Sequence, residues 1–327
     1  MLFSEVVGHA QAKKILQNAL AGRRAAHAYL FNGPAGVGKT TLATAFAAAL
    51  LCGHGVTEAC GSCPICRKIA GQNCPDFFTL VPTGNNIKIE QVRELQKKAR
   101  FKPYEAAAKV YIINQAETMT VEAANCLLKI LEDPPVNTIF LLTAVNQYRL
   151  LPTIISRCQL VPLTRVSQEE IGEMLIKKYG VDGEKAAVLA SLCDGLPGVA
   201  VQMAASGKGL DIRESAFQLA EQITNENVSQ LLKAAEDFEK KKDLLPEILE
   251  QLLLWYRDQL IWLQTGEENL VVNIDKLVHL KNSTASLSRD QLIRSITNII
   301  EAKNHIGRNV NTRLVMEVLL LRLARIA

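Results

Sequence analysis

The sequence predicts an α/β domain built on a parallel sheet, followed by a small helical domain and an all-helical C-terminal domain. Over roughly the first 165 residues, short apolar segments alternate with segments of helical periodicity, which is the pattern of strands covered on both faces by helices. Beyond Ser167 the strand signals fade and the helix formers Leu, Ala, Lys, Glu and Gln dominate. We therefore expect domains at residues 1–165, 166–208 and 209–327.

Five apolar segments of the first domain are expected to form its strands. They are Ala28–Phe31, Phe77–Val81, Lys109–Ile113, Thr138–Thr143 and Gln159–Leu163. Helical segments separate them, at Thr40–Leu51, Ile89–Ala99 and Val121–Leu131. The last of these helices is expected to stop at Pro134-Pro135, because proline cannot continue a helix.

Helix signals define the rest of the chain. Ser167 with Glu170 forms a capping box that opens a helix reaching Lys178. Ser206–Gly209 reads as a linker, and beyond it long amphipathic helices follow, among them Ile248–Leu263 and Val310–Ile326.

The composition is that of an ordinary globular chain, with 48% hydrophobic and 21% charged residues among 327 and a net charge of +4. A charge this small only weakly favours nucleic-acid contact. No apolar run approaches the ~20 residues that span a bilayer. The N-terminal sequence MLFSEVVGHA lacks the regions of a secretory signal. We expect a cytoplasmic protein with reduced thiols and no membrane contact.

The segment Gly33–Thr40 matches the phosphate-loop (P-loop) pattern G-x-x-x-x-G-K-[ST]. Its glycines let consecutive N–H groups face phosphate oxygens, and the next helix adds its N-terminal dipole. Lys39 is expected to contact the β- and γ-phosphates, and Thr40 to hold Mg²⁺. The predicted nucleotide-binding residues, for ATP or ADP, are Gly33, Gly36, Val37, Gly38, Lys39, Thr40 and Thr41. A glycine turn without a ligand is the disfavoured alternative, because the motif lies between a strand and a helix.

The carboxylates of an ATPase are missing. Hydrolysis requires a strand that ends in Asp, often Asp-Glu, because the aspartate supports Mg²⁺ and the glutamate activates water. The corresponding strand, Lys109–Ile113, is followed by the uncharged amides Asn114-Gln115. Glu117 is expected to lie elsewhere on the turn. We expect bound nucleotide to turn over slowly or not at all, with a doubtful role for Mg²⁺.

Four cysteines have the spacing C-x7-C-x2-C-x2-C, at Cys52, Cys60, Cys63 and Cys66. Four thiolates complete a closed tetrahedral zinc site, which is structural rather than catalytic. Free surface thiols are the alternative, and they are disfavoured at this density. His54 and Cys74 are interpreted as bystanders.

Arg157 precedes the last predicted strand of the α/β domain, at the far edge from the chain's own P-loop. An arginine there could reach a γ-phosphate bound by a neighbouring subunit. On chemistry alone, a surface salt bridge is the favoured interpretation.

The chain resembles bacterial clamp-loader subunits of the AAA+ class, and among them the delta-prime type of DNA polymerase III. The similarity extends over essentially the whole chain. The matching segments are Val7-Gly8-His9 with Gln11, His27–Phe31, the P-loop, the cysteine insert, Leu127–Pro135, Ser156-Arg157-Cys158, Trp255–Asp258, and Asn309–Asn311 with Arg313.

The resemblance implies a subunit of a pentameric ring that uses ATP to place the sliding clamp on primer-template DNA, within the polymerase holoenzyme. Its ring partners would be gamma/tau-type motor subunits and a delta subunit. Arg157 would act in trans at the motor's ATP site, while this chain would not itself be catalytic. The last helical domain would be the collar of the ring, and Asn146 would lie near a phosphate-sensing position.

Two departures separate this chain from the motor subunits of the family. One is Asn114-Gln115, and the other is Gly195–Val199, which lacks the arginine that motors carry after a glycine. The alternative is an active gamma/tau-type motor, which would need the carboxylates that this chain lacks. A zinc-finger DNA-binding module would need more basic residues beside the cysteines than Arg67 and Lys68. A P-loop kinase would need an acid pocket that is not evident.

Overall fold

The computed structural model describes residues 2–22, 24–206, 208–225, 228–240, 244–306 and 311–324. The chain divides into two compact units, Met1–Lys178 with Cys193–Val199, and Tyr179–Leu192 with Ala200–Ala327. The expected division into three domains stays a prediction. Among the described residues, no helix combines the length and apolar character that a bilayer crossing requires.

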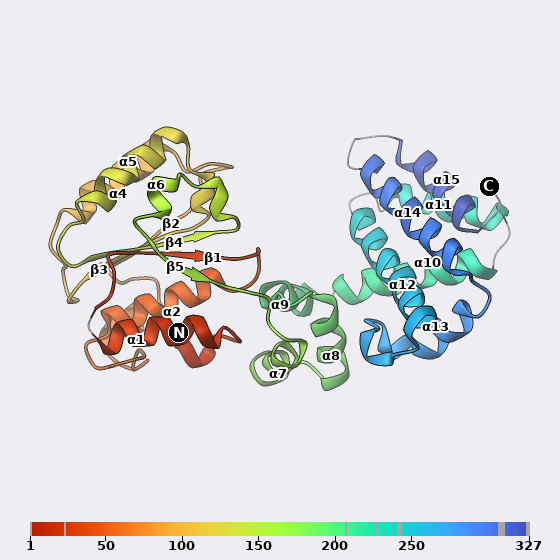
Figure 1. Ribbon diagram of the computed structural model, residues 1–327, viewed down its shortest axis with the longest axis horizontal. Helices are drawn as coiled ribbons and strands as arrows, with labels where there is room; N and C mark the ends of the chain where they lie inside the picture. Colours follow the sequence, from red (N-terminus) through yellow and green to blue (C-terminus); the bar gives the residue numbers. More distant parts are fainter. Residues whose placement is uncertain are drawn as a thin grey trace. The chain divides into compact units, whose positions relative to one another are not determined.

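A five-stranded parallel sheet forms the centre of the first unit (Figure 1). The strands run in the order β2-β3-β4-β1-β5, and every pairing is parallel. Their bounds are β1 (Ala28–Asn32), β2 (Phe77–Leu80), β3 (Lys109–Ile113), β4 (Thr138–Ala144) and β5 (Gln159–Pro162). The predicted parallel sheet is therefore confirmed, with strand ends shifted by at most one residue.

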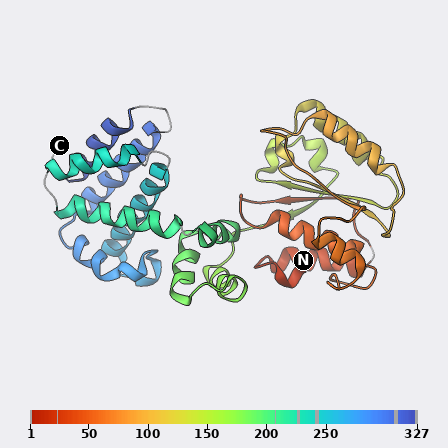
Figure 2. The same ribbon diagram turned by 180° about the vertical axis from the view of Figure 1, so that it is seen from behind.

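Helices cover both faces of this sheet, as Figures 1 and 2 show from opposite sides. On one face lie α1 (Ala10–Ala21), α2 (Lys39–Leu51) and α3 (Pro64–Ala70); on the other lie α4 (Ile89–Ala99), α5 (Val121–Glu132) and α6 (Pro152–Ile155). Successive side chains of β3 alternate between the two cores. Val110 and Ile112 pack toward α2, whereas Tyr111 and Ile113 pack toward α4 and α5. Such two-sided burial explains why the strand reads as a continuous apolar run.

Short helices and one further long helix complete the first unit. The 3-10 helices are η1 (Phe3–Glu5), η2 (Ala116–Thr118) and η3 (Gln147–Arg149), and the long helix is α7 (Gln168–Tyr179). At the start of α7, the Ser167 hydroxyl accepts a hydrogen bond from the Glu170 N–H at 3.3 Å and donates to the Glu170 carboxylate at 3.0 Å. The predicted capping box is confirmed.

The second unit is helical, and its helices from residue 208 onward share one apolar core. Its helices are α8 (Gly183–Leu192), α9 (Pro197–Ser206, whose first turn belongs to the first unit), α10 (Lys208–Asn225), α11 (Val228–Lys240), α12 (Leu245–Thr265), α13 (Leu277–Thr284), α14 (Arg289–Ile306) and α15 (Thr312–Leu323), with the 3-10 helices η5 (Glu268–Leu270) and η6 (Ile274–Lys276). The helix α12 packs against α10, α13 and α14 (Figure 1). The helices predicted at Ile248–Leu263 and Val310–Ile326 correspond to α12 and α15.

Parts of three sequence assignments lie outside the described residues. They are Gly207 of the expected linker, Asn309 and Val310 of the matching segment, and residues 325–326 of the last predicted helix. Within the described part, α9 ends at Ser206 and α10 begins at Lys208. The Asn311 side chain caps α15 by accepting a hydrogen bond from the Leu314 N–H at 3.2 Å.

A buried polar network fastens the segment before α13 to the helices beside it. The Asp258 carboxylate on α12 is fully buried. It accepts hydrogen bonds from the Val272 N–H at 3.1 Å, the Asn273 N–H at 2.8 Å and the Asn273 side-chain amide at 2.7 Å. Arg213 on α10 donates to the Asn273 side-chain oxygen at 3.0 Å and pairs with Asp275 through both terminal nitrogens.

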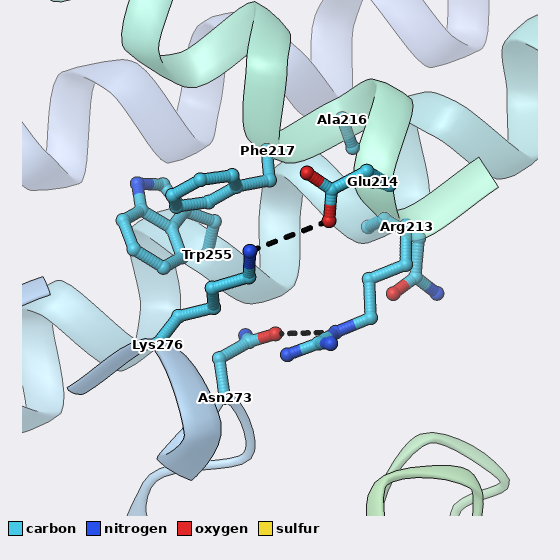
Figure 3. A pocket seen from close by; sticks show the side chains of 8 residues that line it. Arg213, Glu214, Ala216, Phe217, Trp255, Asn273 and Lys276 are labelled. Atoms are coloured by element: carbon cyan, nitrogen blue, oxygen red, sulfur yellow. Dashed lines mark hydrogen bonds and ion pairs between the residues drawn. The ribbon is translucent and has the colours of Figure 1, made fainter. Parts of the chain in front are cut away.

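Figure 3 shows the side chains that lie beside Arg213 and Asn273 of this network. The Lys276 ammonium lies 4.2 Å from the centre of the Phe217 ring and 3.3 Å from the Glu214 carboxylate. The cavity that they surround has a volume of about 10 Å³, which is room for about one water molecule. The arrangement is therefore a structural fastening rather than a ligand pocket.

Candidate functional site

The P-loop follows β1 and leads directly into α2, as the motif predicts. Gly36 and Gly38 have φ angles of 77° and 104°, a left-handed region that glycine enters without steric cost. The Gly33 N–H donates to the Ala144 carbonyl at 3.2 Å, which ties the start of the loop to the end of β4. The helix N-terminus that follows Gly38 supplies N–H groups and a positive dipole end for an anion. The backbone therefore fits a nucleotide phosphate.

Lys39 is the motif's cation, and it is 9% exposed. Its ammonium donates to the carbonyl oxygens of Gly33 at 2.7 Å and Pro34 at 2.8 Å. Burial lowers the pKa of Lys39, and the nearby negative charge of Glu117 opposes that shift. The lysine thus lies folded over the loop that it is expected to serve.

Thr40 and Asn114 meet, although 74 positions separate them in the sequence. The Thr40 hydroxyl donates to the Asn114 side-chain oxygen at 2.9 Å, and the Thr143 hydroxyl donates to the same oxygen at 3.3 Å. Asn114 thus takes the place at the end of β3 from which an aspartate would support Mg²⁺ beside the P-loop threonine. Its amide offers an oxygen without a charge. Gln115 is exposed on the turn that follows, with its N–H donated to Thr143.

Glu117, which was expected elsewhere on the turn, lies at the same edge of the sheet as Asn114. One oxygen of its carboxylate accepts a hydrogen bond from the Val145 N–H at 2.9 Å, just beyond the end of β4. The other oxygen, Oε2, is buried and has no hydrogen-bond partner among the described residues. The sequence alone gives no sign of this contact, because 28 positions separate the two residues and only the pairing of β3 with β4 brings them together.

Two further segments contact the back of the P-loop. The His9 Nε2 lies 2.9 Å from the Val37 carbonyl oxygen, and burial lowers the pKa of His9. The Gly198 N–H donates to the Gly36 carbonyl at 2.8 Å. A Cβ on Gly198 would lie only 2.9 Å from that oxygen, so this position cannot carry a side chain without displacing the loop.

The other predicted positions at this edge have local roles. Thr41 lies half-buried in the first turn of α2. The Asn146 side-chain oxygen accepts a hydrogen bond from the Tyr148 N–H at 2.9 Å and so caps η3.

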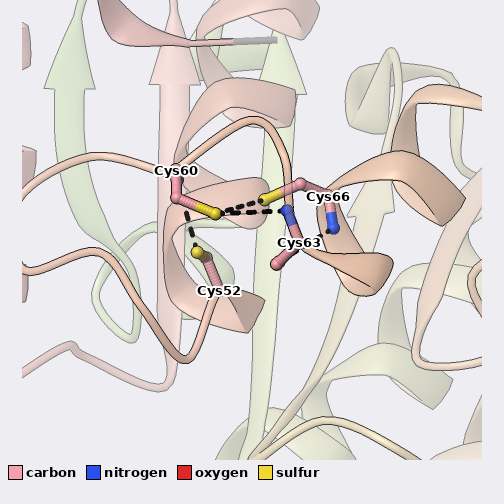
Figure 4. A group of neighbouring side chains, drawn as sticks. All are labelled: Cys52, Cys60, Cys63 and Cys66. Carbon is pink, nitrogen blue, oxygen red and sulfur yellow. Dashed lines mark hydrogen bonds between the residues drawn. The ribbon is translucent and has the colours of Figure 1, made fainter.

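The four predicted cysteines form one cluster, in which the sulfur atoms lie within 4.8 Å of one another (Figure 4). The Cys60 and Cys66 sulfurs are 4.0 Å apart. A tetrahedral zinc ion with Zn–S bonds of about 2.3 Å places its sulfurs about 3.8 Å apart, so the four thiols fit zinc with little adjustment. Neither His54 nor Cys74 belongs to the cluster.

Backbone N–H groups point at the sulfurs of this cluster. The N–H of Cys60, Cys63 and Cys66 lie 3.3, 3.4 and 3.4 Å from the sulfurs of Cys52, Cys60 and Cys63. The N–H groups of Ser62 and Cys63 lower the pKa of the Cys60 thiol to about 6, which favours the thiolate that a metal binds. Burial instead raises the pKa of the Cys66 thiol to about 12. A metal ion would have to displace that proton.

Arg157 lies between α6 and β5. Its guanidinium donates to the Thr153 carbonyl at 2.9 Å and pairs with the Glu132 carboxylate at 2.8 Å. The side chain is one-third exposed. Since β1 and β5 are parallel and Tyr29 pairs with Gln159, Arg157 lies at the amino end of the sheet, whereas the P-loop follows the carboxyl end.

Comparison with known proteins places these features in a family. The chain matches the sequence family "DNA polymerase III, delta subunit" over residues 8–167 and the family "DNA polymerase III, delta subunit, C terminal" over residues 210–325. DNA polymerase III subunit delta' of Bacillus subtilis is 33% identical over 314 residues, which cover 95% of this chain and 94% of the relative.

Two other relatives match shorter stretches. Subunit delta' of Pseudomonas aeruginosa is 37% identical over 219 residues, which cover 64% of this chain and 65% of the relative. Subunit tau of Bacillus subtilis is 31% identical over 282 residues, which cover 80% of this chain and 50% of tau. Because a delta' subunit matches along nearly the full length of both chains, this chain belongs to the delta-prime family of DNA polymerase III clamp-loader subunits.

Proposed function

We propose that this chain is an accessory subunit of a clamp loader, which supplies Arg157 to the ATP site of a neighbouring motor subunit and hydrolyses little or no ATP itself. The observation that carries the proposal is the separation of Arg157 from the chain's own P-loop. The two lie at opposite ends of a parallel sheet whose strand β1 has five residues, a length of about 13–17 Å at ~3.3 Å per residue. Arg157 is therefore available to a different subunit.

The contacts of Arg157 suit this role. Its ion pair with Glu132 joins partly exposed groups, and such pairs contribute about 0.2–1 kcal/mol. A γ-phosphate carries more charge and offers the same forked geometry. The arginine can thus exchange Glu132 for a phosphate at little cost, while its hydrogen bond to the Thr153 carbonyl helps to hold the guanidinium in place.

The neutral pocket supports the second half of the proposal. The groups beside Thr40 are the amides Asn114 and Gln115 rather than carboxylates. The small-domain glycine Gly198 offers no cation to the phosphates. A nucleotide bound there would be held by the P-loop N–H groups and Lys39, and the chain would lack a base to activate water.

The remaining features fit a stable member of a ring. The four cysteines would hold a structural zinc ion, since four thiolates leave no open coordination position. The helical second unit would form the collar contacts with gamma/tau-type and delta subunits. Contact with the sliding clamp and primer-template DNA would then be made through the complex.

Reconstitution with motor subunits tests the proposal. Replacement of Arg157 by Ala should nearly abolish hydrolysis at the one ATP site that it serves, because a trans arginine contributes about 10³–10⁵ to the rate at its site. The DNA-stimulated ATPase of the complex should fall accordingly. The control is Arg149→Ala, an exposed arginine in η3, which should leave the rate unchanged. A normal rate in an intact Arg157→Ala complex would refute the role in trans.

An active motor is the second candidate, because the tau subunit of Bacillus subtilis matches 80% of this chain. The two candidates differ in the isolated protein. The accessory subunit should show negligible hydrolysis, whereas steady turnover that Lys39→Ala abolishes would establish a motor.

A further inference from the structure

Glu117 has a carboxylate oxygen that the fold leaves unused. Its Oε1 accepts the Val145 N–H at 2.9 Å, which would suffice to tie η2 to the end of β4. The Oε2 is buried and has no partner among the described residues. A neutral glutamine could make the same Val145 contact. A buried, charged oxygen without a partner costs free energy. The negative charge of Glu117 therefore needs a functional explanation in addition to its contact with Val145.

The Glu117 carboxylate lies at the edge of the sheet where the γ-phosphate of a bound nucleotide is expected. Asn32 of β1 pairs with Ala144 of β4, and the Gly33 N–H donates to the Ala144 carbonyl at 3.2 Å. Val145, the residue that Glu117 holds, therefore comes directly after the residue that anchors the P-loop. A P-loop backbone cradles the α- and β-phosphates, and its lysine reaches the β- and γ-phosphates. The ends of β3 and β4 thus face the place of a third phosphate.

The charges at this end do not favour a third phosphate. Asn114 and Gln115 are neutral and give Mg²⁺ no charged ligand. Gly198 packs on the loop without a side chain. Lys39 is then the cation of the site, and the Glu117 charge already acts on it. A triphosphate would add negative charge beside the half-buried Glu117 carboxylate, whose Oε2 has no hydrogen-bond partner among the described residues.

We propose that Glu117 makes this P-loop selective for a nucleoside diphosphate over a nucleoside triphosphate. The inference rests on the proposed nucleotide site, and it adds which nucleotide the site retains and which residue selects it. The chain would keep a diphosphate through the cycles of its neighbours, because neither hydrolysis nor exchange for a triphosphate is favoured. Glu117 is in this sense a specificity-determining residue and not a catalytic one.

Isothermal titration of the purified full-length chain with ADP and with ATP, in the presence and absence of Mg²⁺, tests this inference. We expect ADP to bind about tenfold more tightly than ATP, because the extra phosphate of ATP brings a further negative charge near Glu117 and solvent screens the repulsion in part. Glu117→Gln retains an oxygen for the Val145 N–H and removes the charge. It should bring the two affinities to within about twofold, mainly because ATP binds more tightly. Glu122→Gln, at an exposed carboxylate in the first turn of α5, should change neither.

Several outcomes would overturn the inference. They are equal or tighter binding of ATP by the wild-type chain, an unchanged ratio in Glu117→Gln, and the absence of binding of either nucleotide. The wild-type ratio decides the question even when Glu117→Gln fails to fold. Lys39→Ala should abolish binding of both nucleotides, which assigns the measured site to the P-loop. A failure here leaves the Arg157 effect in the complex untouched, and a failure of that effect leaves this ratio untouched.

Discussion

Removal of the Asp258 carboxylate should destabilise the helical second unit strongly. Asp258 is fully buried, and it accepts hydrogen bonds from two backbone N–H groups and from the side-chain amide of Asn273. Asp258→Ala leaves these donors without a partner inside the fold. It also loosens the oxygen of Asn273 to which Arg213 donates.

The magnitude follows from these contacts. A buried donor that loses a charged acceptor costs about 1.5–3 kcal/mol, and the three are not additive because the 271–276 segment can shift toward water. We therefore expect a loss of about 3–4 kcal/mol, within the range for the breaking of a buried charged network. For a helical unit of this size, a urea m-value of about 2 kcal/mol/M turns that loss into a fall of the unfolding midpoint by about 1.5–2 M.

Tryptophan fluorescence isolates the relevant unit, because the chain has two tryptophans and both, Trp255 and Trp262, lie in α12. Urea unfolding followed by this signal therefore reports the second unit within the full-length protein. Asp290→Ala, at an exposed residue in the first turn of α14, is the control and should cost less than about 0.5 kcal/mol. A midpoint shift below about 0.3 M in Asp258→Ala would refute the reasoning.

Three further predictions concern the first unit. Burial raises the pKa of Asp76, but hydrogen bonds from three backbone N–H groups and the charge of Lys109 outweigh this effect and leave the pKa lowered. The stability that this carboxylate contributes should therefore be complete above roughly pH 4 and be lost as the pH falls through the folded-state pKa. In urea unfolding, Asp76→Asn should lose less stability than the wild type as the pH falls below roughly 4. Protein purified without chelator should contain about one zinc per chain, which Cys63→Ser should lower, and a clearly substoichiometric content in the wild type would contradict the four-thiolate site. Glu132→Ala should change the ATPase of the reconstituted complex by less than about fivefold, because a surface ion pair contributes under about 1 kcal/mol. A loss as large as that of Arg157→Ala would instead make Glu132 essential.

The α/β sheet was predictable because its strands are buried on both faces. Such strands read as short apolar runs, and the helices between them keep their own period, so β3 and α4 were predicted with their observed ends. The helix α3 was not predicted, since it lies among the cysteines. It begins at Pro64, with the Cys63 sulfur accepting the Cys66 N–H, and its seven residues are too few to show a helical period.

The site was predictable where its residues belong to one local motif, and Asn114 was predictable because it directly follows a buried strand. The P-loop and the cysteine cluster have fixed spacings, and the four sulfurs meet as expected. The contacts of Glu117, Glu132 and Gly198 were not predicted, because each contact joins segments that lie far apart in the sequence. The pairing of β3 with β4 brings Glu117 to Val145, and tertiary packing brings Glu132 to Arg157 and Gly198 to Gly36, so no local pattern encodes these contacts.

We propose that the chemistry assisted by this chain occurs at a neighbour's ATP site. A comparison of Lys39→Ala with Arg157→Ala is the most direct test. Each variant would replace the wild-type chain in the same reconstituted clamp loader, and the DNA-stimulated ATPase would be measured after a check of assembly by size. We expect a large fall with Arg157→Ala and a nearly normal rate with Lys39→Ala. A large fall with Lys39→Ala and a normal rate with Arg157→Ala would contradict the proposal.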